Sequence, residues 1–223
     1  MSITAGAARG EVPLGRQAAL GLGAAVAYLS VRGAVSAADG RAQNNADAVA
    51  RLERSLGLRE FAAPLWAGAG EWLYTWGHWL LAVALLVGLA RRAPALYYRA
   101  RDTMLLTAGV ALFAFVVYPV APPDVSGGLA SLPSLDAAWD VVLGLSVAAF
   151  ASRAWVRVAG VGLAGLLLWS VVLTGHHYLI DVLAGAALAL VAWLFVGSRR
   201  RPQRLRGYAG WDGLDLHKTD NTA

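Results

Sequence analysis

The sequence predicts an all-α membrane protein, a polytopic bundle of about six transmembrane helices with a short amphipathic helix on its surface. Hydrophobic residues make up 58% of the 223 residues, nine residues are tryptophan, and the mean hydropathy is positive. This composition excludes a water-soluble domain. Because the chain has no cysteine, a disulfide framework and a thiolate metal site are excluded as well.

Six apolar runs, each near the ~18–20 residues that cross a bilayer, account for the predicted transmembrane helices. They are Leu14–Val35, Trp72–Ala90, Thr103–Val120, Leu135–Ala151, Trp155–Thr174 and Tyr178–Gly197. The fourth run is the least apolar, because Asp136 and Asp140 interrupt it. The first run has an alternative interpretation as a signal peptide, since Val35-Ser36-Ala37 resembles a small-residue cleavage site. Its length favours an uncleaved anchor.

The basic residues predict how the bundle is oriented. Fourteen of the 19 fall in segments 9–16, 91–101, 153–157 and 199–218, which lie on one side of a six-span arrangement. By the positive-inside rule this side is cytoplasmic. The net charge of +5 therefore reflects membrane topology and does not indicate a nucleic-acid partner.

Both chain termini are then cytoplasmic, and the expected location is the plasma membrane. The loops around Pro122 and His176 carry no lysine or arginine, so they are predicted to face outward. Residues 1–206 form one integral-membrane domain. The polar tail 207–223 is predicted to be disordered.

A short helix is predicted between the first two runs. Val49, Leu52 and Leu56 recur at helical spacing, which indicates an amphipathic helix over Asn44–Phe61 on the outer membrane surface. The alternative is a plain linker helix.

The segment Thr174–Asp181 carries the strongest catalytic candidates. A histidine and an aspartate at the edge of a bilayer are costly, which favours a functional role for them. His177 and Asp181 are four residues apart, a spacing that places two side chains on one helical face. The carboxylate can then orient the imidazole and leave its other nitrogen open as a nucleophile or base.

Two further segments on the outward side are expected to converge on the same site. Tyr118–Asp124 contains prolines that fix the backbone and end the preceding helix. Leu132–Asp136 enters the fourth apolar run, with Ser134 as the predicted helix cap.

A resemblance to the type 2 phosphatidic acid phosphatase superfamily is carried by three stretches in order, YPVAPP, PSL and TGHHYLIDVLAG. Within that superfamily they are similar to the branch that holds inositol phosphorylceramide synthase. Further similarities to this branch are Glu53-Arg54, Leu56-Gly57, Tyr74 and Gly77-His78-Trp79. The resemblance covers nearly the whole membrane core.

The resemblance implies a helical-bundle enzyme that acts on phosphate or diphosphate esters of lipids at the outer face, without a cofactor. In such enzymes a histidine attacks phosphorus and an aspartate orients it, and by position these are His177 and Asp181. A second histidine, after a proline-serine pair, protonates the leaving group. Basic residues bind the phosphate oxygens.

The sequence departs from this pattern at the supporting positions. Asp136 stands where the leaving-group histidine belongs, Asp124 stands where arginine is usual, and Val171 follows Ser170 where the superfamily often has arginine. A carboxylate repels phosphate and cannot donate a proton unless its pKa is strongly raised. Loss of a general acid typically lowers a rate ~10²–10⁴-fold.

Three interpretations remain open. In the first, the protein is still a lipid phosphatase or phosphotransferase. Asp136 is then protonated in apolar surroundings and serves as the acid. The missing phosphate clamp is supplied by Arg51, Arg54 or Arg59, and His78 is a lesser candidate for substrate contact.

In the second interpretation the site depends on Mg²⁺ and ionises a prenyl diphosphate, as in a terpene cyclase or a transferase. Asp136 and Asp140 are four residues apart on one helical face, Asp124 lies shortly before them, and carboxylates facing a diphosphate suit Mg²⁺. The aromatic residues expected to face a carbocation are Trp139, Trp169 and Tyr178. In the third interpretation catalysis is lost and the bundle binds a lipid or a protein.

Overall fold

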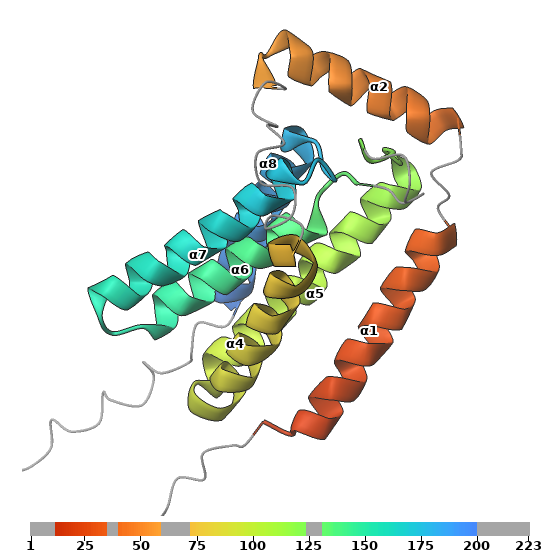
Figure 1. The fold of residues 1–223 in the computed structure, drawn as a ribbon. Helices are drawn as coiled ribbons and strands as arrows, with labels where there is room; N and C mark the ends of the chain where they lie inside the picture. Colours follow the sequence, from red (N-terminus) through yellow and green to blue (C-terminus); the bar gives the residue numbers. More distant parts are fainter. Residues whose placement is uncertain (1–11, 35–39, 59–71, 124–130, 200–223) are drawn as a thin grey trace, which may run out of the picture.

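Helices form all the regular structure in the described part of the chain, residues 12–34, 40–58, 72–123 and 131–199 of a computed structural model (Figure 1). In chain order they are α1 (Leu14–Ala34), α2 (Gly40–Ser55), the π-helical η3 (Leu73–Gly77), α4 (His78–Arg92), α5 (Pro94–Val117), α6 (Leu135–Phe150), α7 (Ala154–Leu173) and α8 (Leu179–Arg199). The predicted all-α fold class is confirmed. The predicted tail 207–223 lies outside the described residues.

Among the described residues, three helices, α5, α7 and α8, are long and apolar enough to cross a membrane. With 15 and 16 residues, α4 and α6 are shorter than the ~18 residues that usually span a bilayer. Large apolar side chains nevertheless cover the outside of the bundle, among them Phe113, Val158 and Leu194, which are 70%, 73% and 69% exposed. Such a surface suits contact with lipid. The count of six spans stays a prediction.

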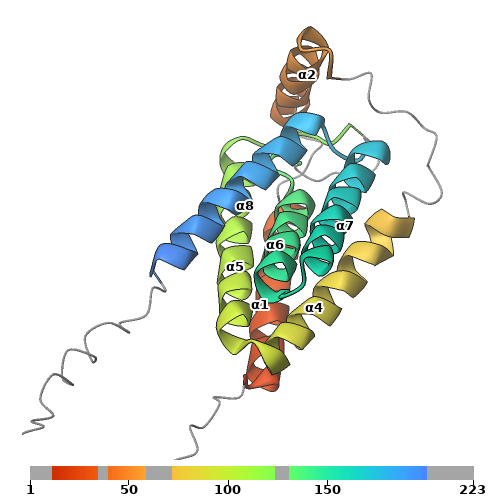
Figure 2. The ribbon, with the colours of Figure 1, turned by 90° about the vertical axis from the view of Figure 1, so that its left-hand side faces the viewer.

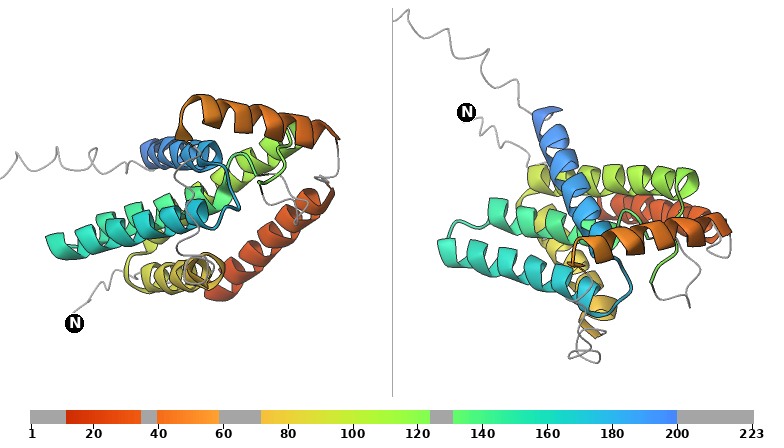
Figure 3. Two further views of the ribbon diagram at one scale, coloured as in Figure 1. Left: turned by 45° about the horizontal axis from the view of Figure 1, so that its top comes forward. Right: turned by 90° about the horizontal axis from the view of Figure 1, so that it is seen from above.

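The centre of the bundle is α6, with α4, α5, α7 and α8 packed around it (Figures 2 and 3). Two glycines let α6 and α7 approach closely. A Cβ at Gly144 would lie 2.7 Å from that of Ala164, and one at Gly160 would overlap Val147. Small residues commonly allow such packing between membrane helices. Since α6 also carries Asp136 and Asp140, its central place surrounds these carboxylates with neighbouring helices.

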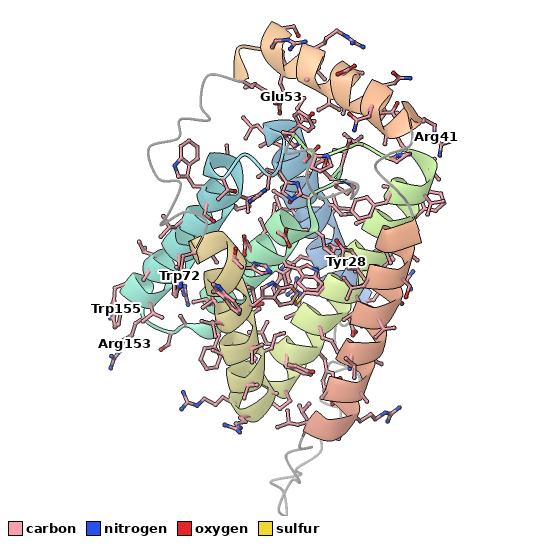
Figure 4. All side chains as sticks on the ribbon, turned by 45° about the vertical axis from the view of Figure 1, so that its right-hand side comes forward. Tyr28, Arg41, Glu53, Trp72, Arg153 and Trp155 are labelled. Atoms are coloured by element: carbon pink, nitrogen blue, oxygen red, sulfur yellow. The ribbon has the colours of Figure 1, made fainter. Side chains whose placement is uncertain are left out.

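The segments that carry the predicted cytoplasmic charge gather at one end of the bundle. The α4–α5 and α6–α7 connections, the start of α1 and the end of α8 lie there, and α2 crosses the opposite end (Figure 2). Arg153 and Trp155 mark the first end, and Glu53 of α2 marks the other (Figure 4). This arrangement agrees with the one-sided charge distribution. Which end faces the cytoplasm stays a prediction.

The short amphipathic helix that the sequence predicts is present as α2. The helix runs from Gly40 to Ser55, so it begins before the predicted Asn44, and residues 59–61 of the predicted range lie outside the described residues. Leu52 and Leu56 are 49% and 58% exposed. Its buried residues are Ala42, Ala46, Val49, Ala50 and Glu53. Short alanine side chains bring the α2 backbone against the proline-rich segment after α5. There the N–H of Ala121 donates to the Ala42 carbonyl (3.1 Å).

Candidate functional site

His177 lies in the connection between α7 and α8, at the end of the bundle that α2 crosses (Figure 1). The connection turns at Gly175, whose φ of +74° lies in the left-handed region that glycine adopts without strain. The four-residue spacing predicts that His177 and Asp181 share one helical face. This is wrong, because α8 begins at Leu179 and His177 precedes the helix. The pair forms nonetheless, with Nδ1 of His177 3.7 Å from Oδ2 of Asp181.

Asp181 is held in the first turn of α8. Its side chain is fully buried, and Oδ2 accepts the backbone N–H of Tyr178 (3.2 Å). The positive end of the helix dipole also stabilises a carboxylate in this turn. Asp181 is therefore a fixed negative charge on the Nδ1 side of His177.

Asp136 faces the other ring nitrogen of His177, with Oδ2 3.7 Å from Nε2. The starts of α6 and α8 are tied together here, because the Ser134 N–H donates to the backbone carbonyl of Asp181 (3.0 Å). Ser134 is also the helix cap that the sequence predicts. The close approach depends on Gly185, since a Cβ there would overlap the Ser134 carbonyl oxygen. His177 consequently lies between two carboxylates.

The surroundings of His177 favour its protonated form. Its side chain is only 8% exposed, and this burial by itself lowers the pKa of the imidazole. The carboxylates of Asp136 and Asp181 act in the opposite direction and raise the pKa to about 9. His177 is thus an imidazolium at neutral pH and has to release its Nε2 proton before it can attack an electrophile.

A second histidine–aspartate pair lies deeper in the bundle. Nδ1 of His78 is 2.6 Å from Oδ1 of Asp140, and the two side chains are 4% and 1% exposed. His78 is the first residue of α4 and follows the π-helical η3 directly. Short π-helical segments are frequent at functional sites, because they change the direction of the residues that follow them.

Aromatic rings hold the His78 imidazole in place. The ring is stacked along Trp139 at a centroid distance of 6.4 Å and an interplanar angle of 14°, and it meets Trp79 edge-on at 5.3 Å. Three buried polar atoms of this cluster have no hydrogen-bond partner within the described residues: Nε2 of His78, Oδ2 of Asp140 and Nε1 of Trp139. Buried polar atoms are normally satisfied, so this cluster is suited to a polar ligand.

The family model of the PAP2 superfamily matches residues 47–126 and 124–195. The chain belongs to the PAP2 superfamily. No curated protein and no solved structure matches it at a significant level. The superfamily and the long apolar helices together indicate that this PAP2 member is an integral membrane protein of a phosphatase-like class. The matched segments contain both histidine–aspartate pairs.

The geometry of this PAP2 member changes the interpretation of Asp140. The Mg²⁺ hypothesis pairs Asp140 with Asp136, whereas one oxygen of Asp140 is engaged by His78. Over the described ranges, no group of three or more metal-ligating side chains is arranged to hold a metal ion. Asp124 lies outside the described residues. The Mg²⁺ hypothesis therefore stays a prediction that rests on Asp136 and Asp140 alone.

The remaining candidates of this PAP2 member lie beneath or on α2. Tyr178 is 7% exposed and packs with Val120 and Ala121 under the helix. Arg54 and Arg51 are exposed on α2, and Arg59 lies outside the described residues. Substrate contact by Tyr178 or Arg54 stays a prediction.

Glu53 has a structural role beside the site that the sequence did not predict. Its side chain is buried, and Oε1 accepts the N–H of Ile180 in the first turn of α8 (2.9 Å). The first N–H groups of a helix have no acceptor within the helix, so Glu53 satisfies one of them and docks α2 over the site. The signal that could have indicated this contact is an acidic residue on the same face of α2 as its alanines.

Proposed function

We propose that the protein cleaves a phosphate or diphosphate ester of a membrane lipid at the outer membrane face, with His177 as the nucleophile. The observation that supports this most directly is the position of His177, buried between Asp181 on its Nδ1 side and Asp136 on its Nε2 side. Phosphoryl transfer through a histidine needs an orienting group on one ring nitrogen and an accessible second nitrogen.

The two aspartates have different roles in this proposal. Asp181 is the orienting group, since it is buried and its Oδ2 is fixed by the Tyr178 N–H. Asp136 is 29% exposed and accepts the Nε2 proton of His177 when substrate binds. Neutral His177 then attacks phosphorus and forms a phosphohistidine.

Positive charge is needed near the substrate, because two carboxylates repel a phosphate. The exposed arginines of α2, Arg51 and Arg54, are the candidates in the described chain, since Glu53 between them docks the helix on α8. The substrate tail lies in the bilayer. The likeness to the inositol phosphorylceramide synthase branch favours an alcohol as well as water as the acceptor.

A second candidate is Mg²⁺-dependent ionisation of a prenyl diphosphate. The observation in its favour is the aromatic cluster beside Asp140, in which the ring centroids of Trp79 and Trp139 are 5.9 Å apart. Aromatic faces stabilise a carbocation.

The experiment is product analysis with purified protein and a panel of lipid phosphates and prenyl diphosphates, with Mg²⁺ and with EDTA, beside His177→Ala. We expect phosphate release that is unchanged by EDTA and is lost in His177→Ala. Diphosphate release with a new hydrocarbon or alcohol, only with Mg²⁺, would favour the second candidate. No product from any substrate of the panel would favour a protein that has lost catalysis and binds a lipid or a protein.

A further inference from the structure

We infer that His78, held by Asp140, is the proton donor to the leaving group, in place of the histidine that Asp136 replaces. This inference rests on the proposed function, because it assigns the acid of the same phosphoryl-transfer reaction. It adds a catalytic residue from α4, a helix outside the three stretches that carry the sequence resemblance.

The two histidine–aspartate pairs are built alike. In each, Nδ1 of the imidazole faces an aspartate, at 2.6 Å in the His78 pair and at 3.7 Å in the His177 pair. Nε2 of His78 has no hydrogen-bond partner within the described residues, and Nε2 of His177 faces Asp136. Asp136, beside His177, and Asp140, beside His78, are four residues apart on α6, one turn or ~6 Å along the axis of the helix. Asp136 is also close enough for its charge to act on both His78 and Asp140. The two imidazoles therefore share one face of α6.

Asp136 is poorly suited to be the acid. A carboxylate 3.7 Å from an imidazolium is stabilised in its ionised form. The one proton that Asp136 accepts comes from His177 and is needed to restore that imidazolium, so Asp136 has none to give to the leaving group. His78 has the opposite surroundings. The Asp140 carboxylate at 2.6 Å favours the imidazolium, whose Nδ1–H then donates to Oδ1.

The free nitrogen of His78 is the atom that would carry the donated proton. Nε2 is buried and has no hydrogen-bond partner within the described residues. Stacking on Trp139 fixes the plane of the ring, and η3 sets the direction in which the first residue of α4 projects. A proton donor with a fixed ring and an unused nitrogen is what leaving-group protonation requires.

Nε2 of neutral His177 forms a P–N bond while the P–O bond to the leaving alcohol breaks. The electron pair of that bond stays on the alcohol oxygen, which takes the Nε2 proton of His78. Water then cleaves the P–N bond and gives its proton to His78, and Asp136 returns its proton to Nε2 of His177, so both histidines and Asp136 are in their starting states. Asp140 is a positioning residue, since it acts through His78.

The test compares His78→Gln with wild type on an alkyl phosphate and on phenyl phosphates whose leaving groups grow more acidic, up to nitrophenol. A nitrophenolate leaves without protonation. We expect the rate on the alkyl phosphate to fall ~10²–10⁴-fold and the rate on nitrophenyl phosphate to fall less than ~10-fold. The dependence of the rate on leaving-group acidity becomes steeper. Asp140→Asn gives the same pattern with a smaller loss.

Val83→Ala is the matched control, because Val83 lies on the same helix as His78 and is 60% exposed. The ratio of its two rates should equal that of wild type. Equal loss on all substrates in a folded His78→Gln protein, or no loss, would overturn the role of His78 alone. A wild-type protein that releases no phosphate in a His177-dependent manner would overturn the proposed function and this inference with it. Thermal unfolding of each variant in detergent reports folding, and phosphohistidine formation from nitrophenyl phosphate by His78→Gln supports the inference.

Discussion

Nε2 of His177 lies 3.7 Å from Oδ2 of Asp136, and the two residues come from the α7–α8 connection and from the first turn of α6. Asp136 occupies the place where the superfamily resemblance implies a histidine. At this distance the carboxylate holds a proton on the nucleophile instead of delivering one to the leaving group. An aspartate at this position therefore keeps His177 protonated in the resting site. The proton donor to the leaving group then has to be another residue.

His177→Asn is expected to lower turnover by more than ~10⁴-fold, because the nucleophile is lost while the polar side chain keeps most of the volume. Phosphate release from the preferred lipid phosphate is the measurement. The control is His176→Asn, which changes a histidine of the same connection and should retain most activity. Normal turnover by His177→Asn would exclude a covalent mechanism at this residue.

The rate should rise with pH as His177 loses its proton and reach half of its maximum near the His177 pKa of about 9. Asp136→Asn removes one of the charges that raise this pKa, so the rise shifts to lower pH. Rate profiles from pH 6 to 10 measure the shift, and Asp47→Asn, an exposed aspartate of α2, is the control. An unchanged midpoint in Asp136→Asn would show that another group sets the profile.

The same pKa has a consequence for stability. Because folding raises the pKa of His177 above 6.5, its contribution to stability is fully present below pH 6.5 and is lost as pH rises through about 9. Thermal unfolding in detergent at pH 6 and pH 10 should show a larger decrease for wild type than for His177→Asn. Equal decreases would contradict the ion pairs of His177.

Glu53→Ala should destabilise the protein by about 1–3 kcal/mol, because the N–H of Ile180 loses its acceptor and α2 loses a docking contact. Glu53→Gln should recover part of the loss, since the amide oxygen can accept the same hydrogen bond. Denaturation of each variant is the measurement. Asp47→Ala, on the exposed side of α2, is the control, and an equal effect of both alanine variants would contradict the docking role.

Gly185→Ala should lower both stability and activity, because its Cβ would overlap the Ser134 carbonyl oxygen and push α8 away from α6. Gly162→Ala is the matched control, since a Cβ there meets nothing within 4 Å. Thermal unfolding and phosphate release compare the two. An active, stable Gly185→Ala protein would show that the starts of α6 and α8 need not be held this closely.

Orientation in the membrane is tested by single cysteines in this cysteine-free chain. Ser55→Cys, at the end of α2, should react with a membrane-impermeant thiol reagent added outside intact cells, and Ser198→Cys, near the end of α8, should react only after lysis. Both positions are exposed. The reverse pattern would place the site at the inner face.

Local sequence signals predicted much of the fold. Apolar runs mark α1 and α4 to α8, and Ser134 marks the start of α6, because chain composition and helix caps act within a few residues. The helix α2 was predicted from Val49, Leu52 and Leu56, whereas the alanines that pack it on the bundle gave no signal in the sequence. Leu52 and Leu56 remain exposed in the structure.

The site was predictable where its residues are near in sequence, or where the family resemblance relates them, as it relates Asp136 to His177. His177 and Asp181 form the pair that their spacing suggests, although α8 starts between them. His78 and Asp140 are 62 residues apart, and only the packing of α4 on α6 joins them. Each residue was a candidate on its own, but no pattern in one sequence links them.

The most direct test of the central claim is to trap the intermediate on His177. Purified protein is mixed with a lipid phosphate, quenched within milliseconds in alkali, where phosphohistidine survives, and digested for mass spectrometry. The proposed mechanism predicts phosphate on His177 that appears before product and is absent from His177→Asn. Turnover with no phosphohistidine at any time, or with phosphate on a different residue, would contradict it.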